Sequence, residues 1–221
     1  NGTIRMNGVA GVNGLIIGNH PGTVATLATM SATDFFTVGG VSTVSGGADD
    51  TVLQTTGPGT VVLASPNTYI GNWNFMAATN QLFDPSSLGT GENVNIGAGA
   101  IFDFTAYGAA PFTPPTEGFG GSGTGTTLGV NAAAVIGDAG SSLDLTGKNI
   151  NLTFAPANTS GDLTHPALYV AQGTLSIGGN TFFINNASGS PLGVGTYRLI
   201  QQATGNIASA GGYAALVSGS G

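Results

Sequence analysis

The chain has 221 residues and a formal net charge of −7, with three Lys and Arg residues, 39 glycines and no cysteine. Charged residues make up 6% of it, against about 25% in an ordinary globular protein. This composition excludes nucleic acid and anionic membrane surfaces as partners, since both need clustered Lys and Arg, and it excludes disulfides and thiolate metal sites.

The hydrophobic content of 41% separates the chain from disordered proteins, which combine low hydrophobicity with high net charge. We therefore expect an ordered protein whose surface consists of short polar side chains and backbone. No apolar run approaches the roughly 20 residues that a membrane-spanning helix needs, so we expect no membrane insertion. Because the chain begins at Asn1 without an initiator Met, we expect a processed or excised piece of a longer protein.

Short segments of alternating apolar and polar residues predict strands along the whole chain. Helix signals are almost absent, because good helix formers with polar side chains are scarce and glycine recurs every few residues. In chain order, the clearest predicted strands are 60–63, 101–104, 143–145, 150–154, 174–177, 181–184 and 196–200. The sequence therefore predicts an all-β fold.

The predicted strands recur with a period. A glycine, a small residue and an apolar residue open many of them, at Gly2, Gly22, Gly40, Gly59, Gly99, Gly173 and Gly195, with a variant at Ser141. Most steps between these openings are one or two multiples of about 20 residues, which matches one coil of a β-solenoid with three short strands. One step, from Ser141 to Gly173, does not fit. A β-sandwich, with strands roughly 8–12 residues apart, is the alternative.

Residues 57–73, which read G-P-G-T-V-V-L-A-S-P-N-T-Y-I-G-N-W, resemble the autotransporter-associated β-strand repeat. That repeat has the form G-x-G-T-[LV]-x-L-[ST]-G-x-N-T-Y-x-G, followed by a strand, an A-L-G element and a second strand. Here residues 80–82 stand at the strand, 87–89 at the A-L-G element and 94–104 at the closing pair. The chain departs from the repeat at Ser65-Pro66, where S-G is usual, and at Asn72-Trp73, where G-G is usual.

The resemblance covers residues 55–105, and residues 140–221 are similar in style to the tail regions of large repeat-bearing surface proteins of environmental bacteria. It implies a right-handed parallel β-helix in a secreted or surface-exposed bacterial protein with an adhesive, scaffold or matrix role. The family has no catalytic residues to carry over. In such a helix Asn67 would lie at a turn, and Tyr69 would either cap that turn or fill the core.

We expect one elongated domain over residues 1–221 with two interruptions. Residues 106–129 contain three prolines and then a glycine-rich run, which predicts an excursion out of the coil stack with a flexible tip. Residues 156–166 predict a shorter loop.

Motifs for catalysis and metal binding are weak. His20 and His165 both precede proline, which is typical of turns, and no zinc-binding spacing is present. No G-x-S-x-G elbow supports a Ser-His-Asp triad. The adjacent acids Asp49 and Asp50 lie in a predicted turn and are weak candidates for calcium, which prefers oxygen ligands. We therefore expect no enzymatic activity and no cofactor.

Five aromatic residues are candidates for an interaction surface. Exposed rings could stack on sugars, cap the end of the solenoid or dock on a neighbouring copy. The candidates are Trp73, Tyr69, Tyr107, Phe112 and Phe119. Three of them lie around the predicted proline-rich excursion, where a neighbouring molecule could reach them.

Together these observations predict an extracellular or cell-surface structural protein. An uncapped solenoid end is an open sheet edge, and few charges oppose contact, so we expect head-to-tail association into a homo-oligomer, filament or surface matrix. A glycan-binding adhesin module is the alternative. A polysaccharide-active enzyme is a third hypothesis, which the scarcity of Lys and Arg disfavours.

Overall fold

The computed structural model describes residues 14–17, 24–38, 43–46, 51–90, 93–97, 99–103, 111–113, 118–123, 142–170, 173–203 and 206–219. Within these ranges every pairing between strands is parallel. The fold is all-β with parallel sheets, as the sequence predicts, and is consistent with a fold of the solenoid kind. The β-sandwich alternative is wrong, because sandwiches are built from antiparallel sheets.

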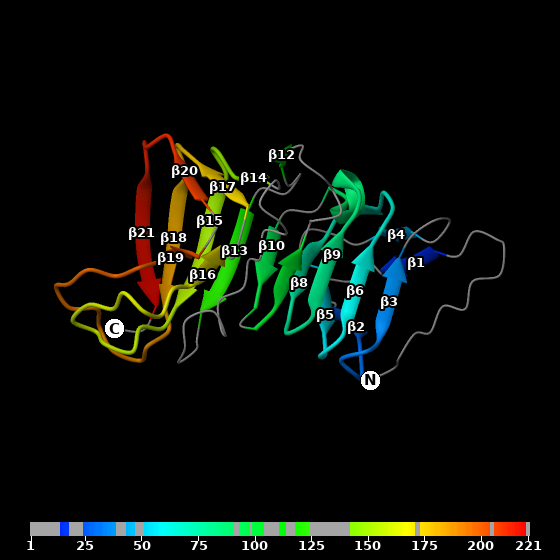
Figure 1. Ribbon diagram of the computed structural model, residues 1–221, viewed down its shortest axis with the longest axis horizontal. Coiled ribbons are helices and arrows are strands. Elements are labelled where there is room, and N and C mark those ends of the chain that lie inside the picture. Colours follow the sequence, from blue (N-terminus) through cyan, green and yellow to red (C-terminus); the bar gives the residue numbers. More distant parts are fainter. Residues whose placement is uncertain are drawn as a thin grey trace.

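One sheet of eight strands runs the length of the described structure, and we call it the long sheet (Figure 1). Its strands, in spatial order, are β2 (Val24–Ala28), β5 (Val52–Thr56), β8 (Asn72–Phe75), β10 (Asn93–Ile96), β13 (Gly118–Gly123), β15 (Asn149–Phe154), β18 (Thr181–Asn186) and β21 (Ala214–Gly219). The spatial order of these strands is also their order in the chain, so the sheet grows in one direction.

Four smaller sheets accompany the long sheet, two in each half of the chain. In the N-terminal half, one small sheet contains β1 (Gly14–Ile17), β4 (Thr43–Gly46) and β7 (Thr68–Tyr69). The other contains β3 (Phe35–Val38), β6 (Thr60–Leu63), β9 (Thr79–Leu82) and β11 (Ile101–Asp103). In the C-terminal half, one small sheet contains β12 (Pro111–Phe112), β14 (Ser142–Asp144), β17 (Thr174–Ile177) and β20 (Asn206–Ser209). The other contains β16 (Leu168–Val170) and β19 (Ile200–Gln202). We call the stretch of chain between equivalent positions of successive long-sheet strands a rung.

The length of a rung differs between the two halves. Val52 in β5 pairs with Asn72 in β8, so this rung comprises residues 52–71. Asn149 in β15 pairs with Thr181 in β18, so that rung comprises residues 149–180 and is more than half as long again. The predicted coil of about 20 residues therefore holds for the segment that resembles the repeat and is wrong for the C-terminal half.

One connection accounts for most of the difference. Residues 57–59 join β5 to β6, and residues 76–78 join β8 to β9. The equivalent connections in the C-terminal half are residues 155–167 and 187–199, which we call the long loops. The long loops project together from one side of the sheet stack (Figure 1). The first of them includes the predicted loop at 156–166.

The short turns require glycine where consecutive rungs touch. Gly57 has a φ of +102°, and a Cβ atom there would overlap the backbone carbonyl oxygen of Thr29 in the preceding rung. A Cβ atom at Gly59 would lie 2.5 Å from the Asp34 carbonyl oxygen and 2.6 Å from that of Ser31. A larger residue at either position would separate the two turns.

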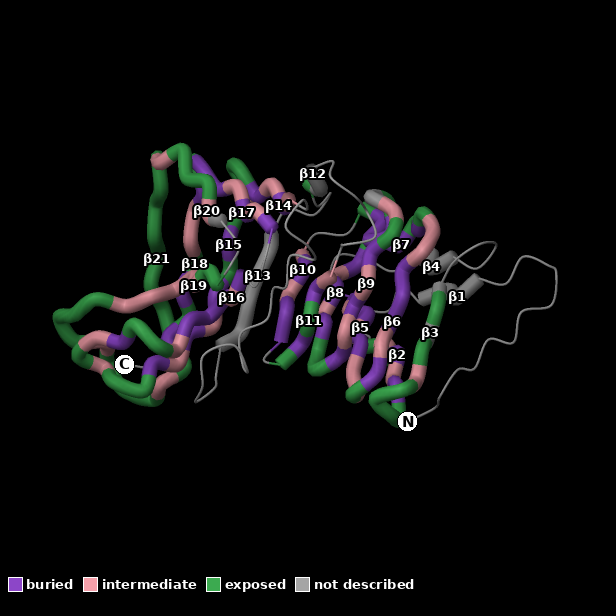
Figure 2. The backbone as a smooth tube through the Cα atoms, viewed as in Figure 1, coloured by how far each residue is buried: buried purple, intermediate pink, exposed green. Residues whose placement is uncertain are grey.

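Buried residues occur along both halves (Figure 2), and they form one hydrophobic core cluster. In the N-terminal half the core is aromatic, with ring centroids 5.5 Å apart between Trp73 and Phe75 and 5.2 Å apart between Phe75 and Phe102. The Trp73 indole donates a hydrogen bond of 2.9 Å to the Leu88 carbonyl oxygen, which lies in the 3₁₀ helix η1 (Pro85–Leu88). In the C-terminal half the core is mostly aliphatic.

Two further sequence-based expectations are corrected. Part of the predicted excursion at 106–129 forms β13, which lies in the long sheet between β10 and β15. Glycine-rich strands are possible there because the sheet ladder uses backbone groups, with no need for side chains. Of the predicted strand at 196–200, only Ile200 is in a strand, and the rest belongs to the second long loop. No helix in the described ranges has the length and apolarity needed to cross a membrane.

Candidate binding site

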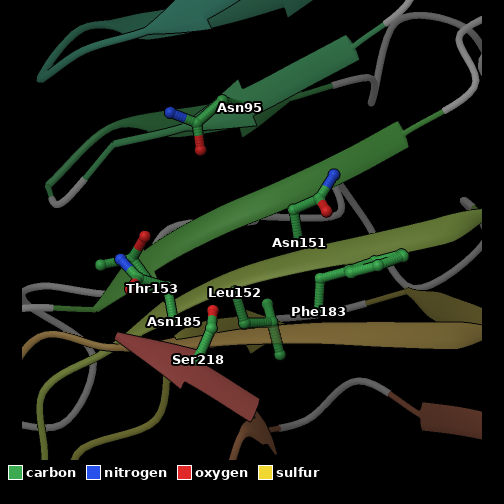
Figure 3. A pocket seen from close by; sticks show the side chains of 7 residues that line it. All are labelled: Asn95, Asn151, Leu152, Thr153, Phe183, Asn185 and Ser218. Atoms are coloured by element: carbon green, nitrogen blue, oxygen red, sulfur yellow. The ribbon is translucent and has the colours of Figure 1, made fainter. Parts of the chain in front are cut away.

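A hollow lies on the outer face of the long sheet and is lined by residues of β10, β15, β18 and β21 (Figure 3). Its volume is about 150 Å³. Side chains with amide, hydroxyl and aromatic groups line it, and we call it the amide hollow: Asn95, Asn151, Leu152, Thr153, Phe183, Asn185 and Ser218. The hollow is open to solvent, so a ligand would not need to displace any part of the sheet.

Strand register creates the hollow. Asn95 on β10 and Asn151 on β15 both pair with Gly120, which lies between them on β13. Neighbouring strands are about 4.8 Å apart, so the two asparagines stand roughly 10 Å apart with no side chain between them. The glycine thus leaves a gap in a row of outward-facing polar residues.

Two rows of side chains form the sides of the hollow. Asn151 pairs with Phe183, and Thr153 pairs with Asn185, so the two pairs stand two residues apart on the same face. Leu152 lies between the rows, and because its own side chain is buried in the core, it contributes to the floor. Figure 3 shows Asn151 and Phe183 at one end of the hollow and Thr153 and Asn185 at the other.

The asparagines of the hollow differ from the buried asparagines. The buried amide of Asn80 accepts a 2.6 Å hydrogen bond from Thr55 Oγ1 and donates to two carbonyl oxygens, and Asn180 is similarly satisfied. Within the described part of the chain, the side-chain amides of Asn95, Asn151 and Asn185 form no hydrogen bond with another residue. Their donors and acceptors are therefore available to a ligand.

Phe183 gives the hollow an apolar surface. Its side chain is 38% exposed, whereas the preceding Phe182 packs against the core. The alternation of the strand explains the difference, because Phe182 pairs with the buried Ile150 and Phe183 therefore points outward. An exposed ring beside unpaired amides is typical of a surface that binds a ligand with both polar and apolar faces.

A second polar cluster lies in the first long loop and holds that loop together. The Asp162 carboxylate accepts hydrogen bonds from the backbone and hydroxyl of Thr164, both 2.8 Å, and from the Ala157 N–H at 2.7 Å. His165 Nδ1 lies 2.7 Å from the same carboxylate. Burial raises the pKa of Asp162, but these hydrogen bonds outweigh it and hold the pKa well below its usual range.

The same loop contacts its counterpart in the next rung. Asp162 pairs with Tyr197 in an isolated parallel bridge, and the Tyr197 hydroxyl donates to the carbonyl oxygens of Thr159 and Gly193. Both oxygens of the Asp162 carboxylate contact groups of the first long loop, which favours a structural role for Asp162. His165 lies in a loop, as the sequence predicts.

The structure corrects two of the predicted interaction residues. Trp73 and Tyr69 are 0% exposed and lie in the core, where their rings meet edge to face at 5.5 Å. Burial raises the pKa of Tyr69, whose hydroxyl donates to the Asn72 carbonyl oxygen. Neither ring is available to a sugar or to a neighbouring molecule.

The structure does not describe the side chains of the other predicted site residues. Phe112 and Phe119 are in β12 and β13, and their side chains are outside the description. Tyr107, Asp49 and Asp50 lie outside the described residues. Among the residues that are described, no group of three or more His, Asp or Glu side chains is placed to hold a metal ion.

Phe183 was not among the residues predicted from the sequence, although a signal for the hollow is present there. Residues 149–154 read N-I-N-L-T-F and residues 93–96 read N-V-N-I, so both segments place Asn on one face and apolar residues on the other. What the sequence did not provide was the pairing that sets Gly120 between Asn95 and Asn151.

No family model matches the chain, and comparisons with curated proteins and with solved structures found no match either.

Proposed function

We propose that this chain is a structural segment of an extracellular or cell-surface protein, without enzymatic activity. In this proposal the parallel sheets form a right-handed parallel β-helix that associates head to tail with further copies. The observation that carries the proposal is the exposed strand β21 at one edge of the long sheet.

All six residues of β21 are exposed, whereas β10, inside the sheet, alternates between partly exposed and buried residues (Figure 2). Val217 on β21 pairs with Ile184 on β18. Ile184 is 7% exposed and Val217 is 64% exposed, although both occupy the same inward position of the sheet. A further rung on β21 would bury Val217 and continue the core.

The composition supports association by this edge. An open edge presents unpaired backbone donors and acceptors, and charged side chains are the usual protection against pairing. The strand reads A-A-L-V-S-G and carries no charge. Association of one end with the opposite end of another copy is heterologous, and such contacts produce filaments when they do not close into a ring.

Electron microscopy and sedimentation velocity over a range of protein concentrations test the proposal. We expect elongated particles whose length grows with concentration, and we expect Val217→Lys to shift the distribution to single copies. Val194→Lys is the matched control, because Val194 is fully exposed in the second long loop, away from the edge. A chain that stays monomeric at every concentration, or a Val217→Lys variant that associates like the Val194→Lys variant, would contradict the proposal.

A further inference from the structure

We propose that the amide hollow binds a neutral oligosaccharide, with Phe183 as the stacking platform and with Asn95, Asn151 and Asn185 as the hydrogen-bonding groups. This inference goes beyond the proposed structural function and does not depend on head-to-tail association. It assigns ligand binding to the outer face of the long sheet, whereas association is proposed at the sheet edge.

The polar groups of the hollow match the hydroxyls of a sugar. Each side-chain amide offers one acceptor oxygen and two N–H donors, so it can bind two neighbouring hydroxyls that each donate and accept. Asn95 and Asn151 are in register with Gly120 on its two sides, and a ring lying flat on the sheet between them would reach both amides. Thr153 and Ser218 add hydroxyls at the other side of the hollow.

The aromatic ring matches the remaining face of the same ligand. A pyranose ring has hydroxyls at its rim and C–H groups on its faces, and those C–H groups pack on the negative face of an aromatic ring. Phe183 is exposed beside Asn151, which is its register partner. One ligand could therefore stack on Phe183 and hydrogen-bond to Asn151 at the same time.

The charge of the site indicates a neutral sugar. None of the described residues that line the hollow is Asp, Glu, Lys or Arg, so none of them would compensate the carboxylate of a uronate or the phosphate of a teichoic-type polymer. The net charge of −7 would also repel an anionic ligand at low ionic strength.

The position of the hollow favours a sugar over an extended peptide. Peptides in extended form are recognised by pairing with an open sheet edge, which satisfies their backbone groups. The amide hollow lies on the face of the sheet, where β10, β13, β15 and β18 already use their backbone groups in the ladder. A peptide there would leave its own N–H and C=O groups without backbone partners.

Isothermal titration calorimetry with neutral gluco-, xylo- and chito-oligosaccharides, preceded by a glycan array, tests the proposal. A small open site that holds about one ring is expected to bind with a Kd of about 1 mM. Oligogalacturonate is the anionic probe, and we expect it to bind at least about tenfold more weakly than the best neutral probe.

Three variants connect binding to the hollow. Phe183→Ala is expected to weaken binding about tenfold or more, because it removes the stacking platform. Gly120→Val fills the gap between Asn95 and Asn151 without removing a polar group, and it is expected to abolish binding at that position. Phe35→Ala is the matched control, since Phe35 is 71% exposed on β3 at a distance from the hollow and its loss should leave binding unchanged.

Circular dichroism and thermal unfolding of each variant establish that the sheets are intact. Val217→Lys should retain the affinity of the parent chain, which separates sugar binding from association. The proposal is overturned if none of the neutral probes binds at millimolar concentration, if oligogalacturonate binds best, or if Phe183→Ala and Phe35→Ala bind alike.

Discussion

The two halves of the molecule share the long sheet but connect its strands differently. In the N-terminal half the short turns at 57–59 and 76–78 lie directly on the neighbouring rungs, and an aromatic core fills the space that they enclose. In the C-terminal half the equivalent connections, 155–167 and 187–199, are several times longer, and they stack on each other through their own hydrogen bonds, outside the sheet. The register of a parallel sheet therefore does not fix the length of its connections.

The comparison also separates two sources of stability. The short turns depend on steric fit between rungs, as at Gly57, where the backbone of the preceding rung comes close. The long loops depend on polar contacts, of which the Asp162 carboxylate provides several. Substitutions in the two halves should therefore destabilise the molecule in different ways.

Trp73→Ala should destabilise the N-terminal half most. It removes the largest fully buried side chain, two ring contacts and the hydrogen bond to the Leu88 carbonyl oxygen. We expect a loss of about 3–5 kcal/mol in the free energy of unfolding, measured by denaturant titration. Phe35→Ala serves as the exposed control, and a loss below about 1 kcal/mol at Trp73 would mean that the aromatic core is not as the structure describes it.

Gly57→Ala should cost about 3 kcal/mol, because the new methyl group would push the turn away from Thr29 and because φ is +102° there. Gly147→Ala is a matched control in the C-terminal half. Gly147 has a φ of +72° but no neighbouring atom within 4 Å of an added Cβ, so only the backbone strain of about 1 kcal/mol remains. Equal losses at the two sites would show that contact between the short turns is unimportant.

Asp162→Asn should loosen the long loops by about 1–2 kcal/mol and leave the N-terminal half unchanged. The measurement is hydrogen exchange of the amides in residues 155–167 and 187–199. Protection there should fall in the variant, whereas the short turns at 57–59 and 76–78 serve as the internal reference. A uniform change over both halves would contradict the independence of the loops.

Acidification should have the same effect as that substitution. The folded-state pKa of Asp162 lies below its unfolded value, so its contribution to stability is complete above that unfolded value, about 3.9, and is lost as the pH falls below it. Exchange in the long loops should therefore rise below about pH 4 in the parent chain and show a weaker dependence in Asp162→Asn. An identical pH dependence in both would indicate that another group is responsible.

The sequence predicted the strands better than it predicted their partners. The predicted segments 60–63 and 174–177 coincide with β6 and β17. Local alternation identifies such strands because it depends only on which side chains face the core. Thr174 pairs with Asn206, one long rung further along the chain, and nothing in the local pattern distinguishes that partner from the glycine motif at Gly195. A glycine in a loop and a glycine before a strand look alike in the sequence.

In the candidate site, too, the local pattern predicts which residues alternate but not which strands pair. The alternation N-W-N-F at residues 72–75 places Trp73 and Phe75 on the face opposite to the asparagines, so the burial of Trp73 could have been predicted from it. The orientation of Phe183 could not, because it follows another Phe and only the pairing with β15 decides which ring is inside. Long-range register determines both the hollow and its aromatic group.

The unequal rungs have a mechanical consequence. Hydrogen bonds between successive strands run along the direction in which the sheet grows, so tension applied along that direction would peel off one rung after another, each adding its full contour length. At about 3.4 Å per residue, the rung at 52–71 releases about 70 Å of chain and the rung at 149–180 about 110 Å. The extension steps in a single-molecule pulling trace would thus report which half is yielding, and the longer C-terminal steps would absorb more displacement per event.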